Sequence, residues 1–198
     1  MTSIDSKTVS RAIKQIVWAR LKTIGFTKFT TRSAWRFEGQ SMQVINFQSF
    51  NSYLASGVGC TTFSFALNLG LHFDFLPLGG GDKYSDRDHP PAEYQCLFRK
   101  PLRTPFKQMN NESPNVWSID PEGGNVVLCV TNALKMIELE GLPWFVELRD
   151  PKNALRILET DDEQFDKFGP SGTWGFGRPH SPMRQRAITQ ITNTIATT

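Results

Sequence analysis

Hydrophobic and polar residues alternate strictly along the segment between Thr62 and Phe73. From Phe63 onward the odd positions are large and apolar, and the even positions are small or polar, namely Ser64, Ala66, Asn68, Gly70 and His72. A period of two is the side-chain repeat of a β-strand, so this segment predicts a strand with one face against a hydrophobic core. We therefore expect its apolar side chains to be buried and the polar Ser64 and Asn68 to be more exposed.

Three further segments alternate in the same way and predict strands: one around Trp35 and Phe37, one over 42–50 and one over 94–99. Between the first two, Glu38-Gly39-Gln40 predicts a tight turn. Residues 51–60 contain two glycines and predict a hairpin loop. Residues 77–91, which include three consecutive glycines and a charged run, predict a mobile loop.

The chain begins with a helical repeat of apolar residues. One stripe is formed by Val9, Ile13, Ile16, Val17 and Ile24. Asp5 or Ser6 provides a cap, and Gly25 ends the helix. The opposite face carries Lys7, Arg11, Lys14, Trp18 and Lys22. Arg20 falls inside the apolar stripe, so we expect its guanidinium to meet a carboxylate or carbonyl oxygens at the rim of the core.

The second half of the chain predicts helices. One covers 126–140 and ends at Gly141, and others begin at Pro143 and at Asp150-Pro151. Strands followed by helices indicate an α+β fold: an antiparallel sheet of about four strands with helices packed on its apolar face. We expect residues 1–198 to form a single α+β domain, with a Gly/Pro-rich loop (168–180) and a C-terminal helix (181–197) as an appendage.

Composition places the chain among globular proteins, with 39% hydrophobic and 21% charged residues in 198. Neither a membrane-spanning run nor a secretory signal is evident, so we expect a cytoplasmic protein without membrane contact. The three cysteines are far apart and predict reduced, buried thiols. The net charge of +3 is unevenly distributed: residues 1–40 hold eight bases and two acids, whereas residues 121–170 hold ten acids and five bases.

Several short motifs occur in a particular order along the chain. They are Gly25-Phe26, NFQS at 46–49, F-x-F-x-x-NLGL at 63–71, C-x-x-R at 96–99, Trp117 before a helix, and GLPWF at 141–145. In this order they resemble the bacterial domain-of-unknown-function family 4304, over roughly residues 10–150. The resemblance implies a bacterial α+β domain whose function is not established, and it assigns no catalytic residue.

The polar face of the predicted sheet is the first candidate site. If the strands pair in a common register, Gln48, Asn68 and Arg99 form a ledge that suits a carboxylate, a phosphate or a peptide backbone. The alternative is that these side chains tie nearby loops in place.

The basic face of the first helix is the second candidate. Lys7, Arg11 and Lys14 around Trp18 predict a surface for an acidic protein or for nucleic acid. The alternative is an ordinary solvated helix face.

Other constellations favour ordinary structural roles. The loop residues Asp82, Asp86, Asp88 and His89 offer oxygen and nitrogen ligands, but their spacing matches no known metal motif. Cys60, Cys96 and Cys129 form no C-x-x-C pair. We therefore expect no metal, cofactor or catalytic residue.

The functional hypothesis is a non-enzymatic binding protein of the bacterial cytoplasm that neutralises or regulates a protein partner, as toxin-immunity proteins do. The alternatives are an enzyme or small-ligand binder that uses the ledge, and nucleic-acid binding through the first helix.

Overall fold

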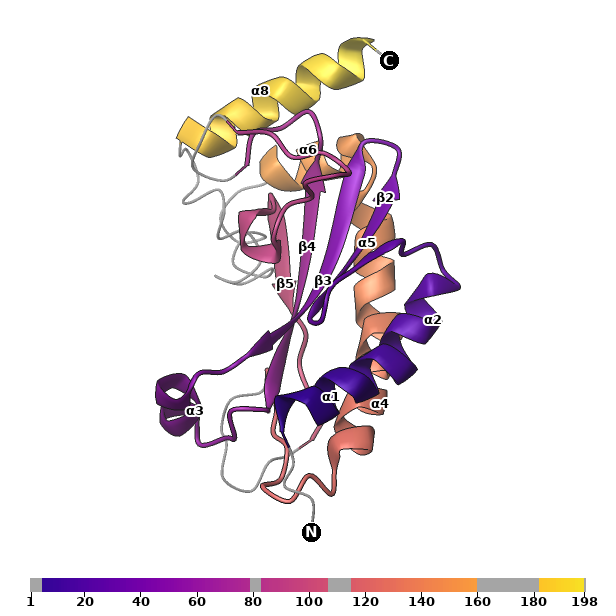
Figure 1. Cartoon of the computed structure of the whole chain (residues 1–198). Helices are drawn as coiled ribbons and strands as arrows, with labels where there is room; N and C mark the ends of the chain where they lie inside the picture. Colours follow the sequence, from indigo (N-terminus) through magenta and orange to yellow (C-terminus); the bar gives the residue numbers. More distant parts are fainter. Residues whose placement is uncertain (1–4, 79–82, 107–114, 160–181, 198) are drawn as a thin grey trace. The chain divides into compact units, whose positions relative to one another are not determined.

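The computed structural model describes residues 5–78, 83–106, 115–159 and 182–197 (Figure 1). The chain divides into two compact units, each built from three separate segments. Unit 1 comprises Met1–Ala34, Ile45–Asn68 and Pro101–Gly141, and unit 2 comprises Trp35–Val44, Leu69–Lys100 and Leu142–Thr198. Each unit is described by itself below, and the expectation of a single domain stays a prediction. The predicted loop at 168–180 lies outside the described residues.

The described strands form one antiparallel sheet in the order β1-β2-β3-β4-β5, with β6 paired to β4. Their bounds are Lys28–Phe29 (β1), Ser33–Glu38 (β2), Ser41–Ser49 (β3), Phe65–Phe73 (β4), Phe98–Pro101 (β5) and Val116–Trp117 (β6). The predicted α+β class is confirmed, with more strands than the four expected. β1 and β6 have only two residues each, too few for alternation to reveal. The strand predicted at 94–99 begins later, because Glu93–Gln95 form a 3-10 turn, η2.

The helical elements are α1 (Ser6–Ala12), η1 (Ile13–Trp18), α2 (Ala19–Lys22), α3 (Ser52–Val58), α4 (Val126–Met136), η3 (Ile137–Gly141), α5 (Leu142–Leu148), α6 (Pro151–Glu159) and α8 (Pro182–Thr197). Two expectations are wrong. Residues 51–60 contain helix α3 instead of a plain loop, and Gly141 does not end a helix, because η3 continues into α5. No described helix has both the length and the apolar character needed to span a bilayer.

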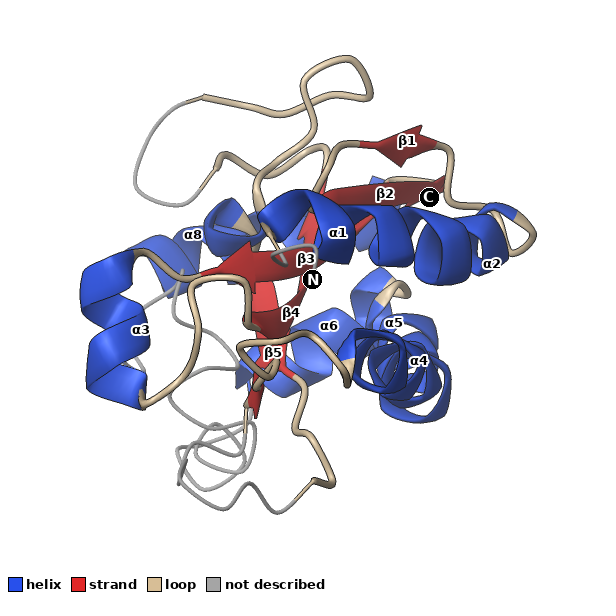
Figure 2. Cartoon of the chain, turned by 60° about the horizontal axis from the view of Figure 1, so that its bottom comes forward, coloured by secondary structure: helices blue, strands red, loops and turns tan. Residues whose placement is uncertain are grey.

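The N-terminal helix runs without a break through α1, η1 and α2 (Figure 2). Asp5 caps it as predicted, because its Oδ1 accepts the backbone N–H of Thr8 at 2.8 Å. Arg20 has the carboxylate partner that its position predicted. Its Nε lies 2.7 Å from Oε1 of Glu138, although about half of the arginine side chain is exposed.

A wide turn of π-helix, η1, changes which side chains of this helix face inward. Its i to i+5 hydrogen bonds delay the rotation of later residues about the axis relative to an α-helix. Leu21 is therefore fully buried together with Val9 and Ile13. Trp18, which regular helical spacing put on the basic face, is only 4% exposed. Its burial differs from the position on the basic face that helical spacing indicated, because periodicity alone assumes an unbroken α-helix.

The core of unit 1 contains a chain of aromatic rings. Trp18 meets Phe47 edge to face at 5.4 Å, Phe47 meets Phe65 at 5.0 Å, and Phe65 stacks on Trp117 at 5.7 Å. The indole Nε1 of Trp117 donates to Oδ1 of Asn132 at 2.9 Å, so this buried nitrogen is satisfied by α4. The rings thus join the N-terminal helix, β3, β4 and β6 in one core.

The predicted burial pattern of the β4 segment is confirmed for its apolar side chains but not for Ser64. Its apolar side chains are fully buried. Asn68 is half-buried, but Ser64, which we expected to be more exposed, is fully buried. The hydroxyl of Ser64 accepts the backbone N–H of Ile119 at 2.9 Å and lies 2.8 Å from Oγ1 of Thr61. Ser64 therefore ties two loops together from a buried position.

In unit 2 the polar face of β4 is covered. Trp35, Val44 and Cys96 form a buried cluster, and the indole of Trp35 donates to the carbonyl of Pro91 at 2.8 Å. Gly70 lies against this cluster: a Cβ atom there would be 2.7 Å from Sγ of Cys96 and 2.8 Å from Cγ1 of Val44. Glycine is therefore required at this position by close packing.

The helices of unit 2 are held by apolar packing, and a side chain of α8 also bonds to the backbone of α6. α6 packs against both α5 and α8. Their buried residues include Phe145, Leu148, Ala154, Ile157, Leu158, Ala187 and Ile191. Arg184, buried at the start of α8, donates from Nε to the carbonyl of Leu158 at 2.8 Å. This bond satisfies a carbonyl near the end of α6 that has no partner within the helix.

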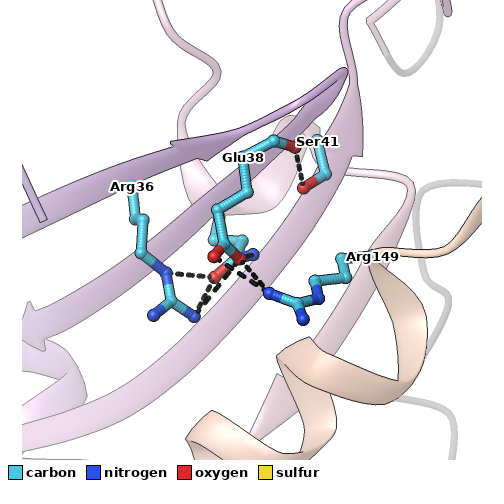
Figure 3. Close-up of polar contacts among 5 residues, drawn as sticks. Arg36, Glu38, Ser41 and Arg149 are labelled. Carbon is cyan, nitrogen blue, oxygen red and sulfur yellow. Dashed lines mark hydrogen bonds and ion pairs between the residues drawn. The ribbon is translucent and has the colours of Figure 1, made fainter. Parts of the chain in front are cut away.

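A polar clamp fixes the β2–β3 turn in unit 2 (Figure 3). Arg149, directly after α5, donates from Nη1 to both carboxylate oxygens of Glu38 at 2.9 and 3.0 Å. Gln43 is fully buried, accepts from Nε of Arg36 at 2.8 Å and donates to Glu38 at 2.9 Å. The hydroxyl of Ser41 donates to the Glu38 carbonyl. Burial alone would raise the pKa of Glu38, but the bonds from Arg149 and Gln43 and the charges of Arg36 and Arg149 hold it below its ordinary value.

The same substitution is expected to have opposite effects at two glycines. Gly70→Ala should lower the free energy of unfolding by about 1–3 kcal/mol, because its Cβ overpacks the buried cluster. Gly57→Ala should raise it by up to about 1 kcal/mol, since Gly57 lies inside α3 with open space around it and alanine is the better helix former. Urea unfolding of both variants tests the pair, and a neutral Gly70→Ala would contradict the described packing.

Candidate partner-binding groove

A groove of about 730 Å³ lies along one face of the N-terminal helix in unit 1. We call it the basic groove. It is lined by Ser6, Lys7, Ser10, Arg11, Lys14, Trp18, Lys22, Phe29, Thr30 and Thr31. The helix forms one wall, and β1 with the turn that follows it forms the other. All four residues that the sequence nominated for partner binding, Lys7, Arg11, Lys14 and Trp18, line this groove.

The cations lie in one row because of their spacing. Lys7, Arg11 and Lys14 occupy positions i, i+4 and i+7, which share one face of a helix. Lys22 extends the row at the far end. All four side chains are exposed, so their ammonium and guanidinium groups are open to a ligand.

The floor and the far wall depend on one turn after β1. Oγ1 of Thr30 accepts the backbone N–H groups of Arg32 and Ser33 at 3.3 and 3.0 Å, so the hydroxyl takes the place of a backbone acceptor in this turn. The carbonyl of Thr30 accepts instead from Nε1 of Trp18 at 3.2 Å. The rings of Trp18 and Phe29 lie 5.7 Å apart. The sequence analysis did not find this wall, although the Thr-Thr-Arg-Ser segment carries a recognisable turn signal.

The electrostatics of the groove are one-sided. Among the described residues, four cations line it and no acidic residue does. Asp5 lies next to the groove, and its pKa is held below the ordinary value mainly by the backbone N–H of Thr8, with a smaller contribution from the charge of Lys7. The ammonium of Lys22 lies 5.4 Å from the centre of the Phe29 ring, a cation–π distance. Two of the lining hydroxyls, those of Ser10 and Thr30, already donate to the carbonyls of Ser6 and Ser33, so the cations are the main donors to a ligand. This set of groups suits a ligand with several carboxylates or phosphates.

The three ledge residues each have a hydrogen-bond partner within their own unit. Nδ2 of Asn68 donates to Oε1 of Gln48 at 2.9 Å within unit 1. Arg99 belongs to unit 2, where Nε and Nη2 donate to the two carboxylate oxygens of buried Glu93 at 2.7 and 3.3 Å. Each side chain is therefore engaged by a partner other than a shared ligand, a geometry that favours a structural role.

The remaining candidate residues support neither a metal site nor a reactive thiol within the described part of the chain. Oδ1 of Asp86 accepts the backbone N–H of His89 at 2.6 Å, and Asp82 lies outside the described residues. Among the described residues, no three His, Cys, Asp or Glu side chains gather as a metal site would require. Burial raises the pKa of the Cys96 thiol far above its ordinary value and that of Cys129 to about 11. Both thiols therefore stay protonated near neutral pH and are poor nucleophiles.

The charged segment 83–91 contacts strand residues within unit 2. Ser85 is buried beside Met42, and Arg87 lies 5.8 Å from the centre of the Phe37 ring. The charged run at this position thus has contacts with the sheet, which the sequence analysis did not anticipate.

Comparison with known proteins gives no assignment. No family model, no curated protein and no solved structure matches the chain. The resemblance to family 4304 therefore stays a hypothesis, and the function is argued from the groove itself.

Proposed function

We propose that this chain is a non-catalytic binding protein whose basic groove receives an acidic surface of a protein partner. The observation that carries the proposal is the row of four exposed cations in a groove that no acidic side chain lines within the described part of the chain. A single exposed ion pair contributes little, but a row of like charges accelerates association and selects partners by charge. Neutralisation of a toxin in the bacterial cytoplasm is the biological role that we favour for such a protein.

The environment of the aromatic groups supports a protein partner over nucleic acid. Proteins that bind single strands stack bases on open aromatic faces. The ring of Trp18 is 4% exposed, and the cation of Lys22 lies near the Phe29 ring. Neither ring therefore offers a free face for a base, whereas both can contact the edge of an apolar side chain at the groove floor.

The pairing of the ledge residues supports a binding role at the groove over an enzyme at the sheet face. Asn68 and Gln48 bond to each other, and Arg99 is held by Glu93. A catalytic or ligand-binding constellation requires side chains that converge on a common point.

Crosslinking from the groove wall tests the proposal. A photoreactive amino acid in place of Thr31 should capture a protein from native cells at low salt. The capture should fall about tenfold or more in the Arg11→Glu/Lys14→Glu variant, because two attractions become repulsions. Lys135→Glu is the matched control, since Lys135 is exposed on α4 and does not line the groove.

Equal capture by the wild type and the double variant would contradict the proposal. Crosslinked material that nuclease removes would instead support nucleic-acid binding. Melting temperatures of all three proteins should agree within a few degrees, because each substitution is on an exposed helix surface.

A further inference from the structure

The cations of the basic groove repeat with the period of a helix. Lys7, Arg11 and Lys14 are spaced by four and three residues, which is about 10 Å at an α-helical rise of about 1.5 Å per residue, and Lys22 extends the row beyond η1. A small anion can touch only one or two of these groups. A ligand that engages the whole row must present its own charges at steps of about 4.5–6 Å.

An α-helix presents charges at these steps. Carboxylates at i, i+4 and i+7 of a partner helix repeat with the same rise as the cations on α1 and η1, so several pairs form in register. An extended chain rises about 3.3 Å per residue, and its side chains on one face are therefore about 7 Å apart. Its charges fall out of register with the row after two or three pairs.

The opposite wall of the groove also argues against an added strand. Strand addition requires free backbone donors and acceptors along a sheet edge. At this wall the carbonyl of Thr30 is already occupied by Nε1 of Trp18, and the chain turns directly after β1, which has only two residues. With two residues in β1 and the Thr30 carbonyl occupied, this wall is too short to pair with an extended peptide.

One apolar step interrupts the row of charges. Trp18 lies between Lys14 and Lys22, and its ring and that of Phe29 line the groove there. An apolar side chain one turn beyond the last carboxylate of a partner helix would meet the partly exposed Phe29 ring, because the Trp18 ring beside it is only 4% exposed. Burial of such a side chain contributes affinity that surface charge pairs alone do not supply.

We infer that the partner surface is an acidic α-helix that lies along α1, η1 and α2, with carboxylates at i, i+4 and i+7 and an apolar residue at i+11. This inference rests on the proposed function of the basic groove. It adds the secondary structure of the ligand and the order of its side chains.

Three end-blocked peptides of about five helical turns test the inference with the full-length protein. The first carries glutamates at i, i+4 and i+7, leucine at i+11, and alanine and glutamine elsewhere. The second has the same composition with the glutamates distributed around the helix. The third is the first peptide with two central prolines, which break the helix. Binding is measured by fluorescence anisotropy, and the contacted surface is mapped by amide chemical shifts.

The first peptide should bind about tenfold tighter than the second and the third, with shifts confined to the groove residues. Its leucine-to-alanine version should bind several-fold more weakly. Arg11→Glu/Lys14→Glu should abolish the preference, and Lys135→Glu should preserve it.

Equal binding of all three peptides would overturn the helical inference and leave the proposed acidic partner in place. Absence of binding by all three would also overturn it, while capture from the Thr31 position would still report on the proposed function. Preferential binding of a single-stranded oligonucleotide of equal charge would overturn both.

Discussion

Leu67→Ala is expected to lower the free energy of unfolding by about 2–5 kcal/mol. Leu67 is fully buried in β4, and its carbonyl accepts the backbone N–H of Leu102 at 2.9 Å. The shorter side chain loses the transfer free energy of its methyl and methylene groups. It also leaves a cavity that the surrounding sheet cannot close, because the backbone of β4 is held on both sides by hydrogen-bonded strands.

Leu128→Ala is the matched control for this prediction. Leu128 lies on α4 and is 59% exposed, so the same atoms are removed from a side chain that is mostly in water. Its loss should stay within about 0.5 kcal/mol. Urea unfolding with a constant m-value measures both changes. A loss below about 1 kcal/mol for Leu67→Ala would show that β4 is not the centre of a packed core.

Strong local patterns predicted the elements that face a core. The alternation in β4 and the apolar stripe of the first helix are consequences of one-sided burial, and both elements exist where the sequence placed them. Helix α3 was missed because most of it is exposed, so it has no apolar stripe to detect. Its end signals were nevertheless present: Asn51 caps the first turn at 2.8 Å, and Gly59 ends the helix with a φ of 73°.

The sequence predicted the row of cations in the basic groove, but neither the burial of Trp18 nor the opposite wall. Lys7, Arg11 and Lys14 could be assigned to one face because their arrangement depends on local helical spacing alone. The burial of Trp18 could not be predicted, because it depends on the π-helical turn η1. A repeat of apolar residues along the sequence does not reveal such a turn. The far wall depends on how the carbonyl of Thr30 is oriented, and the Glu93 partner of Arg99 depends on the turn η2 before β5. These contacts are set by tertiary packing, and residue type alone does not specify them.

His72 is expected to make unit 2 sensitive to mild acid. The imidazole is fully buried on β4, its Nε2 lies 3.1 Å from the carbonyl of Leu76, and its Nδ1 has no hydrogen-bond partner. Burial lowers the pKa of His72 from 6.5 to about 4, and the bond to Leu76 opposes this effect only in part. The ring is therefore neutral in the folded protein at neutral pH, with Nε2 as the donor to Leu76.

The direction of the pH dependence follows from which state binds the proton. Between pH 6.5 and 4 the unfolded chain protonates His72 and the folded chain does not, so the stability contributed by the neutral ring is complete above pH 6.5 and is lost as the pH falls towards 4. At about 1.4 kcal/mol for each tenfold difference in proton affinity, the full loss is about 3 kcal/mol. His72→Gln keeps a donor for Leu76 and removes the titration. Its unfolding free energy should therefore change by about 3 kcal/mol less than that of the wild type over this range.

Carboxylates that titrate in the same range contribute equally to both proteins and cancel in the difference. His89→Gln is the control for loss of an imidazole, because the side chain of His89 is 88% exposed and its replacement leaves the buried ring of His72 in place. An NMR titration of the folded wild type gives an independent measurement that does not depend on the stability of any variant. A His72 imidazole that protonates near pH 6.5 while the protein stays folded would contradict the buried neutral ring.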